Sequence, residues 1–143
     1  MADLTPFGFH GQMEQIWLRA LEGRVYEVCC LPFRVYGLAL GDIVSLDSEA
    51  RTIVDVVRSS GNRVFRVFFP YSASEGEFHE AKGEVASVIR EAGLQAEWSG
   101  DRHVAINVPV DGSVGRVWEV VRELEDVAVW EWSDVEEFRA GRP

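Results

Sequence analysis

The sequence predicts an α+β protein in which a small antiparallel β-barrel-like sheet is followed by a ferredoxin-like βαββαβ half. Three observations indicate this class. Short alternating apolar runs separated by tight turns fill residues 13–62. Two longer segments further along carry apolar residues at helical spacing. From Arg63 onward the elements follow the order strand, helix, strand, strand, helix, strand, which is typical of the split βαβ arrangement.

The same pattern divides the chain into four parts. Residues 1–12 contain one proline and two glycines, and we expect them to form a flexible or loosely packed arm. Residues 13–62 are the barrel-like module and residues 63–134 the ferredoxin-like module. Residues 135–143 are expected to form a tail or a short terminal turn. One shared core and two separate cores are both compatible with this division.

The barrel-like module is expected to contain four strands. The first covers residues 15–21, and Gly23 in the following turn is free to adopt a positive φ. The second strand ends or bulges at Pro32, because proline has no amide hydrogen to donate to a neighbouring strand. The remaining two strands lie between Gly41 and Gly61 and are joined by a short turn.

Residues 31–47, with the sequence LPFRVYGLALGDIVSLD, form the most distinctive stretch of the chain. We expect a loop that crosses the mouth of the barrel, in which two leucines close the end and Gly37 and Gly41 allow the backbone to bend. Asp42 is expected to accept hydrogen bonds from nearby backbone amides, as aspartates in turns do. A structural role therefore accounts for every residue of this stretch.

The second half is expected to contain two amphipathic helices. The first has two possible capping boxes, Ser72 with Glu75 and Ser74 with Glu77, and Gly93 is placed to end it. The second helix follows a capping segment at residues 111–113. Four strands complete the half, at residues 63–70, 94–99, 103–109 and 127–134.

The formal net charge is -10, and it is unevenly distributed. Residues 1–70 carry 8 acidic and 7 basic side chains, whereas residues 71–143 carry 16 acidic and 7 basic side chains. A negative half repels phosphate backbones, so direct nucleic-acid binding is not expected. The same charge favours a basic protein partner or simply solubility.

The reactive side chains do not form a recognisable catalytic or metal-binding set. Cys29 and Cys30 are neighbours, so they are expected to be free thiols in a reducing compartment. The three histidines are far apart in the sequence, and no phosphate-binding glycine loop is present. We expect no catalytic residues, no cofactor and no metal. The absence of a signal-like N-terminus and of a long apolar run predicts a cytoplasmic protein without membrane attachment.

Tryptophans and acids near the C-terminus suggest a binding surface. If Val127 and Val129 face the helices, then Trp130 and Trp132 face away from them on the open side of the sheet. The other half of the chain would cover that face, or a partner would use it. The candidate partner-binding residues are Trp98, Trp130, Trp132, Glu97, Glu131, Asp134 and Glu137.

The segment from residue 14 to residue 110 resembles an uncharacterised bacterial family, domain of unknown function 4265. The resemblance rests on Trp17, on the Tyr26–Glu27–Val28 strand, on the Ser60–Gly61 turn with Arg63 and on the pattern PF…YG…GD. In this sequence that signature consists of Pro32, Phe33, Tyr36, Gly37, Gly41 and Asp42. The resemblance implies no catalytic residues, because the family has no established activity.

Three functions are compatible with these features. The first is a small protein that binds a basic protein partner, such as an immunity protein that neutralises a toxin. The second is a small-ligand sensor, either a monomer or a homodimer. The third is an enzyme whose site lies at the mouth of the barrel near Tyr36 and Asp42. We favour the protein-binding function from the sequence alone.

Overall fold

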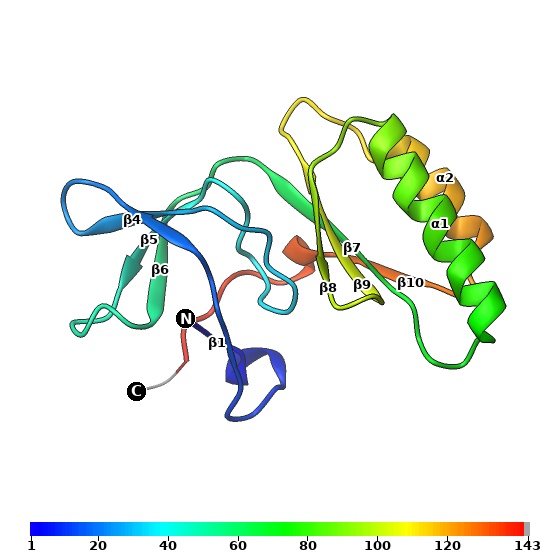
Figure 1. The fold of residues 1–143 in the computed structure, drawn as a ribbon. Helices are drawn as coiled ribbons and strands as arrows, with labels where there is room; N and C mark the ends of the chain where they lie inside the picture. Colours follow the sequence, from blue (N-terminus) through cyan, green and yellow to red (C-terminus); the bar gives the residue numbers. More distant parts are fainter. Residues whose placement is uncertain (142–143) are drawn as a thin grey trace.

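Two four-stranded antiparallel sheets form the body of the protein in the computed structural model, which describes residues 1–141 (Figure 1). The first sheet lies in the N-terminal half and has the order β3-β4-β5-β6. The second has the order β10-β7-β9-β8 and carries two helices. A short pair of strands, β1 and β2, lies at the N-terminus. The α+β class predicted from the sequence is confirmed.

The first sheet is a simple up-and-down arrangement. Its strands are β3 (Leu18–Ala20), β4 (Val25–Val28), β5 (Ile43–Leu46) and β6 (Ile53–Arg58). Val28, Val44 and Ile53 on one face are fully buried. The predicted barrel closure is wrong, because β3 and β6 are the two edges of the sheet and do not pair. Segments without regular strands cover the buried face instead, with Leu4, Val35 and Leu38 in the same cluster.

Residues 2–7 pack against the first half and do not form the predicted arm, whereas residues 8–12 are exposed. β1 (Ala2–Asp3) pairs with β2 (Met13–Glu14), and the 3-10 turn η1 (Thr5–Phe7) lies between them. Leu4 is 1% exposed within the core of the first sheet. The amide of Ile53 also donates to the carbonyl oxygen of Met1 at 2.9 Å. Burial of apolar side chains and backbone pairing thus outweigh the flexibility that the glycines suggest.

The second sheet is covered on one face by both helices (Figure 1). Its strands are β7 (Arg63–Phe68), β8 (Ala96–Ser99), β9 (His103–Val108) and β10 (Val129–Trp132). The helices are α1 (Glu75–Glu91) and α2 (Gly115–Glu123). Of the two possible capping boxes, the structure uses Ser74 with Glu77. Neither helix has the length and apolar character needed to cross a bilayer.

The start of α2 differs from the expected cap. Val114 occupies the N-cap position and its side chain makes no capping hydrogen bond. Ser113 still contributes, because its hydroxyl accepts from the amide of Gly115 at 3.0 Å. The apolar stripe of this helix is anchored by Val117 and Val121, which are buried against the sheet.

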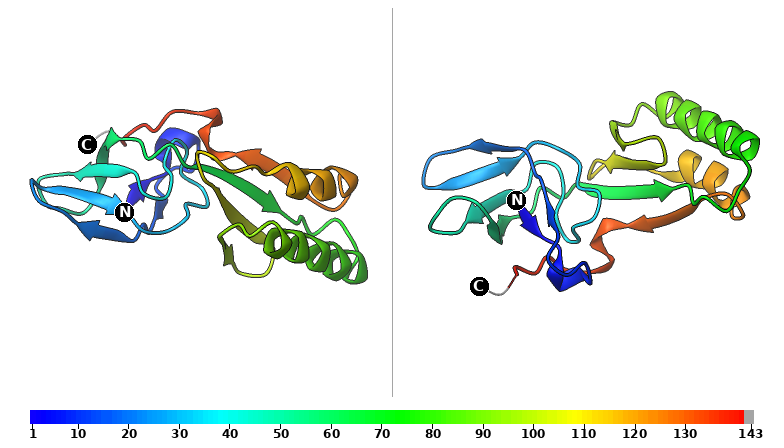
Figure 2. Two further views of the ribbon diagram at one scale, coloured as in Figure 1. Left: turned by 90° about the horizontal axis from the view of Figure 1, so that it is seen from above. Right: turned by 60° about the horizontal axis from the view of Figure 1, so that its bottom comes forward.

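The two halves meet at the sheet face that the helices leave open. Leu31 and Ala39 from the loop after β4 pack with Val64 of β7 and Ala105 of β9 in a small cluster. Both views in Figure 2 show this loop between the first sheet and the second. Each half therefore has its own hydrophobic core, and a third, smaller cluster of buried residues joins the two halves.

The segment after β10 returns to the first half rather than ending as a free tail (Figure 2). It begins with a 3-10 turn, η2 (Ser133–Val135), in which the carbonyl oxygen of Ser133 accepts from the amide of Gly37 at 2.9 Å. Phe138 then packs against the core of the first sheet. The last two residues of the predicted tail lie outside the described residues.

Candidate functional site

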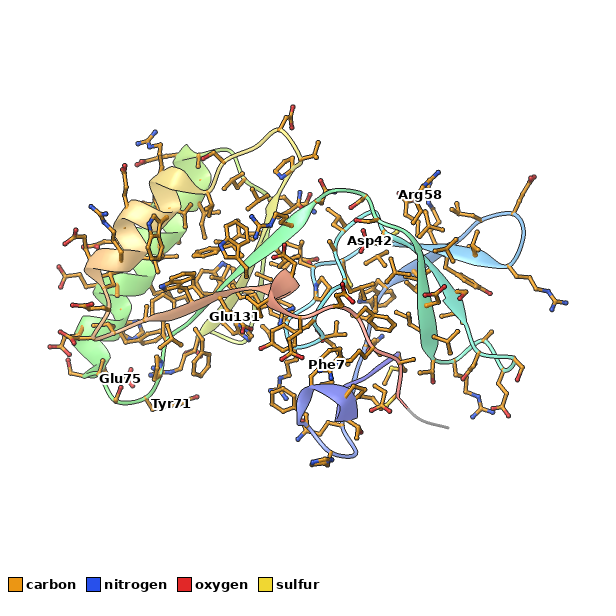
Figure 3. The ribbon with its side chains drawn as sticks, turned by 180° about the vertical axis from the view of Figure 1, so that it is seen from behind. Phe7, Asp42, Arg58, Tyr71, Glu75 and Glu131 are labelled. Atoms are coloured by element: carbon orange, nitrogen blue, oxygen red, sulfur yellow. The ribbon has the colours of Figure 1, made fainter. Side chains whose placement is uncertain are left out.

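A cavity of about 500 Å³ lies where the open face of the second sheet meets the loop after β4 and the N-terminal segment. Figure 3 shows Glu131, which lines it, at the junction of the two halves, with Phe7 nearby on the N-terminal turn. The lining residues come from all three segments: Phe9, Gln12, Phe33, Arg34, Tyr36, Arg66, Phe68, His103, Val129, Trp130 and Glu131. The volume is in the range of pockets that hold small organic molecules.

Aromatic rings make up much of the cavity wall. The ring of His103 lies 5.3 Å from that of Phe33 and 5.7 Å from that of Phe68, in both cases edge to face. Phe68 and Val129 remain 37% and 51% exposed at the rim. Exposed apolar side chains that gather around a concavity mark a surface suited to binding.

The floor of the cavity contains a buried arginine. Arg66 is only 1% exposed. Its Nη1 donates to the carbonyl oxygen of Phe33 at 2.7 Å, and its Nη2 donates to that of Val35. Glu131 Oε1 lies 3.5 Å from Nη1, whereas the buried Nε atom has no hydrogen-bond partner among residues 1–141. Burial lowers the pKa of Arg66, and the nearby carboxylates oppose that shift.

Tyr36 completes the polar floor. Its hydroxyl donates to Glu131 Oε2 at 2.7 Å. Its ring lies 5.2 Å from the guanidinium carbon of Arg66 and 5.4 Å from the ring of Phe7. Burial and the hydrogen bond to Glu131 raise the pKa of Tyr36 to about 12, so the hydroxyl keeps its proton at neutral pH. Arg66, Tyr36 and Glu131 thus form one connected set.

Carboxylates fix the loop that carries Phe33 and Tyr36. Glu14 of β2 accepts hydrogen bonds from three successive amides, those of Phe33, Arg34 and Val35, at 2.6, 3.0 and 2.8 Å. Arg66 holds the carbonyl oxygens of the same loop, as described above. Charge-assisted hydrogen bonds of this kind are among the stronger ones in proteins. The cavity wall is therefore held in place before any ligand arrives.

His103 is neutral at physiological pH. Burial lowers the pKa of its imidazole to about 4, and the charges of Arg66 and Arg34 add to the shift. The ring therefore presents a polar but uncharged edge among the aromatic side chains. It is too weak a base to hold a proton near neutral pH.

Asp42 of the signature stretch serves the backbone. It is 3% exposed, and its two carboxylate oxygens accept from the amides of Ala39 and Ser60, both at 2.8 Å. Gly41 adopts a φ of +82°, which favours glycine. Among the other signature residues, only Phe33 and Tyr36 reach the cavity.

The predicted orientation of the C-terminal tryptophans is wrong. Trp130 pairs with Val67 and Trp132 pairs with Phe65, so both lie on the face that the helices cover. Trp130 contacts Trp118 of α2, with 4.4 Å between their ring centres. Val127 does pack on the helix side, but it belongs to the turn after α2 and not to the strand, so it does not fix the face of Val129. The strand starts at Val129, and this places Val129 on the open face.

The candidate partner-binding residues do not form one surface. Trp98 packs on the helix-covered face, 6.4 Å from the ring of Phe69, and Glu97 accepts from the amide of Leu31 at 2.5 Å. Asp134 binds Arg63 through two hydrogen bonds, of 2.9 and 3.1 Å. Glu137 is exposed on the C-terminal segment.

Of these predicted residues, Trp130 and Glu131 line the cavity. Sequence reasoning missed Arg66, His103, Phe68 and Arg34. The signal for Arg66 was a charged residue between apolar ones in the run RVFRVFF, which an exposed strand face would also show. Residues 1–141 contain no group of three His, Cys, Asp or Glu side chains arranged to hold a metal ion.

Residues 14–132 match the model of a domain of unknown function, DUF4265. The chain belongs to the DUF4265 family. This match covers every cavity residue except Phe9 and Gln12, which precede the family-matched part. The signature residues that fix the loop after β4 are thus within the DUF4265 domain.

A solved structure described as a hypothetical protein from Neisseria gonorrhoeae has a similar fold. The TM-score is 0.66 at 13% sequence identity, and the alignment covers 84% of this chain and 82% of that chain. At this identity the similarity extends to the fold alone. No curated protein matches the chain.

Proposed function

We propose that this protein binds a small molecule in the cavity between its two halves. The observation that carries the proposal is the connected set of the buried Arg66 with the half-buried Glu131 and Tyr36 on the floor of a concavity with aromatic walls. Burying a guanidinium is costly, and a packed apolar side chain would join the two halves with less desolvation. A polar floor beneath an apolar wall is the usual composition of a ligand pocket.

The protonation states favour recognition over catalysis. A general acid or base works best with a pKa near the working pH. The pKa of His103 is about 4 and that of Tyr36 about 12, so both groups keep one protonation state near pH 7. Both carboxylate oxygens of Asp42 accept hydrogen bonds from backbone amides. An enzyme site near Tyr36 and Asp42 would therefore lack a free carboxylate at Asp42.

The strand order supports a finer description of the second half. The order β10-β7-β9-β8, with all neighbours antiparallel and both helices on one face, is consistent with a ferredoxin-like module. We propose that description, with the ligand held on the open sheet face. In this proposal the first half acts as the cover of that face.

A basic protein partner is the second candidate, and the charge of residues 71–143 favours it. An immunity protein in the cytoplasm is the form of this proposal that follows from the sequence. Its binding surface would have to use exposed acids such as Glu137 and the apolar rim of the cavity, because Trp98 and Trp132 contact the helices. A pull-down from native lysate at two salt concentrations tests this candidate.

Titration with the neutral fluorescent probe phenylnaphthylamine tests the small-molecule proposal. We expect saturable binding at one site in the wild-type protein. Phe68→Ala removes part of the wall and should weaken binding several-fold. Tyr71→Ala is the control, because Tyr71 is 79% exposed and does not line the cavity. Unsaturable binding, or equal affinity in both variants, would contradict the proposal.

A further inference from the structure

We infer that the ligand of this cavity is a compact apolar molecule with one carboxylate or similar anionic group, and that Arg34 binds that group. This inference rests on the small-molecule function proposed above. It adds the chemical class of the ligand and the end of the cavity at which the anionic group of the ligand lies.

The charges of the lining residues leave one cation unpaired. Arg34, Arg66 and Glu131 are the charged side chains among the lining residues. Arg66 faces Glu131 and the two loop carbonyl oxygens. Arg34 has no carboxylate within ion-pair distance in residues 1–141, although many surface acids surround this strongly acidic chain.

The side chain of Arg34 is directed to the cavity rim by two neighbours. Its Nη1 donates to Gln12 Oε1 at 3.2 Å, and its guanidinium carbon lies 5.8 Å from the centre of the Phe9 ring. Neither contact neutralises the charge. A planar guanidinium with free N–H groups at the edge of an apolar cavity is well suited to a carboxylate.

The electrostatic potential at the end of the cavity near Arg34 and His103 is positive, which suits an anionic group. Arg66 and Arg34 both disfavour the protonated form of His103, which means that a positive potential acts on the ring. The field around Tyr36 comes mainly from Glu131 and disfavours a second anion there. An anionic group is therefore expected beside Arg34 and His103, away from Glu131.

The buried Nε of Arg66 is a second independent observation. Arg66 is 1% exposed and lines the cavity, yet this N–H has no acceptor within the described part of the chain. Buried N–H groups are rarely left without a partner. Because this N–H is itself covered by protein atoms, it does not contact a ligand, but its uncompensated dipole adds to the positive potential at the cavity floor.

Three naphthalene derivatives of similar size test the inference by isothermal titration calorimetry. They are naphthoate, naphthylmethanol and naphthylmethylammonium, which differ in charge. We expect naphthoate to bind about tenfold more tightly than the alcohol, because a hydrogen bond to a charged group contributes about that much. The ammonium compound should bind most weakly.

Arg34→Gln should reduce naphthoate affinity about tenfold and leave the affinity for the alcohol unchanged. Arg58→Gln is the matched control, because Arg58 is exposed on β6 and lies in the other half from Glu131 (Figure 3). Equal affinity of the wild-type protein for naphthoate and the alcohol overturns the anionic ligand but leaves the small-molecule function intact. Failure of all three compounds to bind contradicts both.

Discussion

Nη1 of Arg66 on the second sheet lies 2.7 Å from the carbonyl oxygen of Phe33 in the loop after β4. These two residues belong to different halves of the chain, and the same guanidinium also binds Val35 and approaches Glu131. This buried side chain is therefore one of the contacts that connect the two halves, and it forms part of the floor of the cavity between them. Its removal should affect both stability and binding.

Arg66→Met is expected to destabilise the protein by about 3 kcal/mol, because it leaves two buried carbonyl oxygens without their donor and removes the cation beside Glu131. Urea unfolding followed by circular dichroism measures the free energy of unfolding. Arg58→Met is the control, and its change should stay within about 0.5 kcal/mol because Arg58 is exposed. Equal stability of the two variants would mean that Arg66 does not join the halves.

Glu14→Gln should lower the free energy of unfolding by about 2 kcal/mol. The carboxylate accepts from three backbone amides, whereas an amide side chain offers one oxygen and directs N–H groups toward the remaining donors. Glu22→Gln changes an exposed turn residue in the same way and should have almost no effect. Hydrogen exchange at residues 33–35 should also accelerate in Glu14→Gln, and unchanged exchange there would contradict this role.

Asp42→Asn is expected to destabilise the protein by about 2 kcal/mol. The amides of Ala39 and Ser60 each donate to a different carboxylate oxygen of Asp42. Asparagine has only one side-chain oxygen, so one of the two amides would lose its acceptor. Asp55→Asn on the exposed part of β6 is the control. Thermal unfolding compares the two variants. A fully stable Asp42→Asn protein that lost a chemical activity would instead support the enzyme hypothesis.

Gly37→Ala tests the contact with the C-terminal segment. A Cβ atom on Gly37 would lie 2.0 Å from the backbone nitrogen of Phe138. Gly23→Ala is a matched control, because Gly23 also has a positive φ, of +80°, but has open space around it. Both variants should lose about 1 kcal/mol from backbone strain. Only Gly37→Ala should lower the free energy of unfolding further, and only this variant should make the C-terminal segment sensitive to proteolysis. Similar losses of stability in the two variants would show that the segment tolerates displacement.

Stability should fall as the pH decreases from about 6.5 to about 4. The folded protein lowers the pKa of His103 to about 4, so the unfolded chain binds a proton in this window and the folded chain does not. Because the ring is only partly buried, we expect about 1–2 kcal/mol after solvent screening.

His103→Gln should remove this part of the pH dependence, whereas His79→Gln should retain it, since His79 is exposed. Urea unfolding of both variants at several pH values separates the contribution of His103 from that of the carboxylates. Identical pH profiles of the two variants would contradict the lowered pKa.

Local sequence patterns were sufficient to predict the α+β class, both helices and most strands. The Ser74–Glu77 capping box and Gly93 mark the limits of α1 directly, because helix ends depend on residues close in sequence. The alternation of Phe65 and Val67 likewise placed these residues toward the helices. The resemblance to the DUF4265 family is confirmed by the match over residues 14–132.

The tertiary structure decided which sheet face each side chain occupies and which distant residues the charged side chains contact. Trp130 lies on the face opposite to the predicted one, because Val127 packs on the helix side from a turn and the alternation holds only within the strand that begins at Val129. The burial of Arg66 depends on acceptors 31 and 33 residues away, and Glu14 binds amides 19 to 21 residues away. Local periodicity carries no information about such distant pairs, so only the folded chain shows that these charged residues build a cavity.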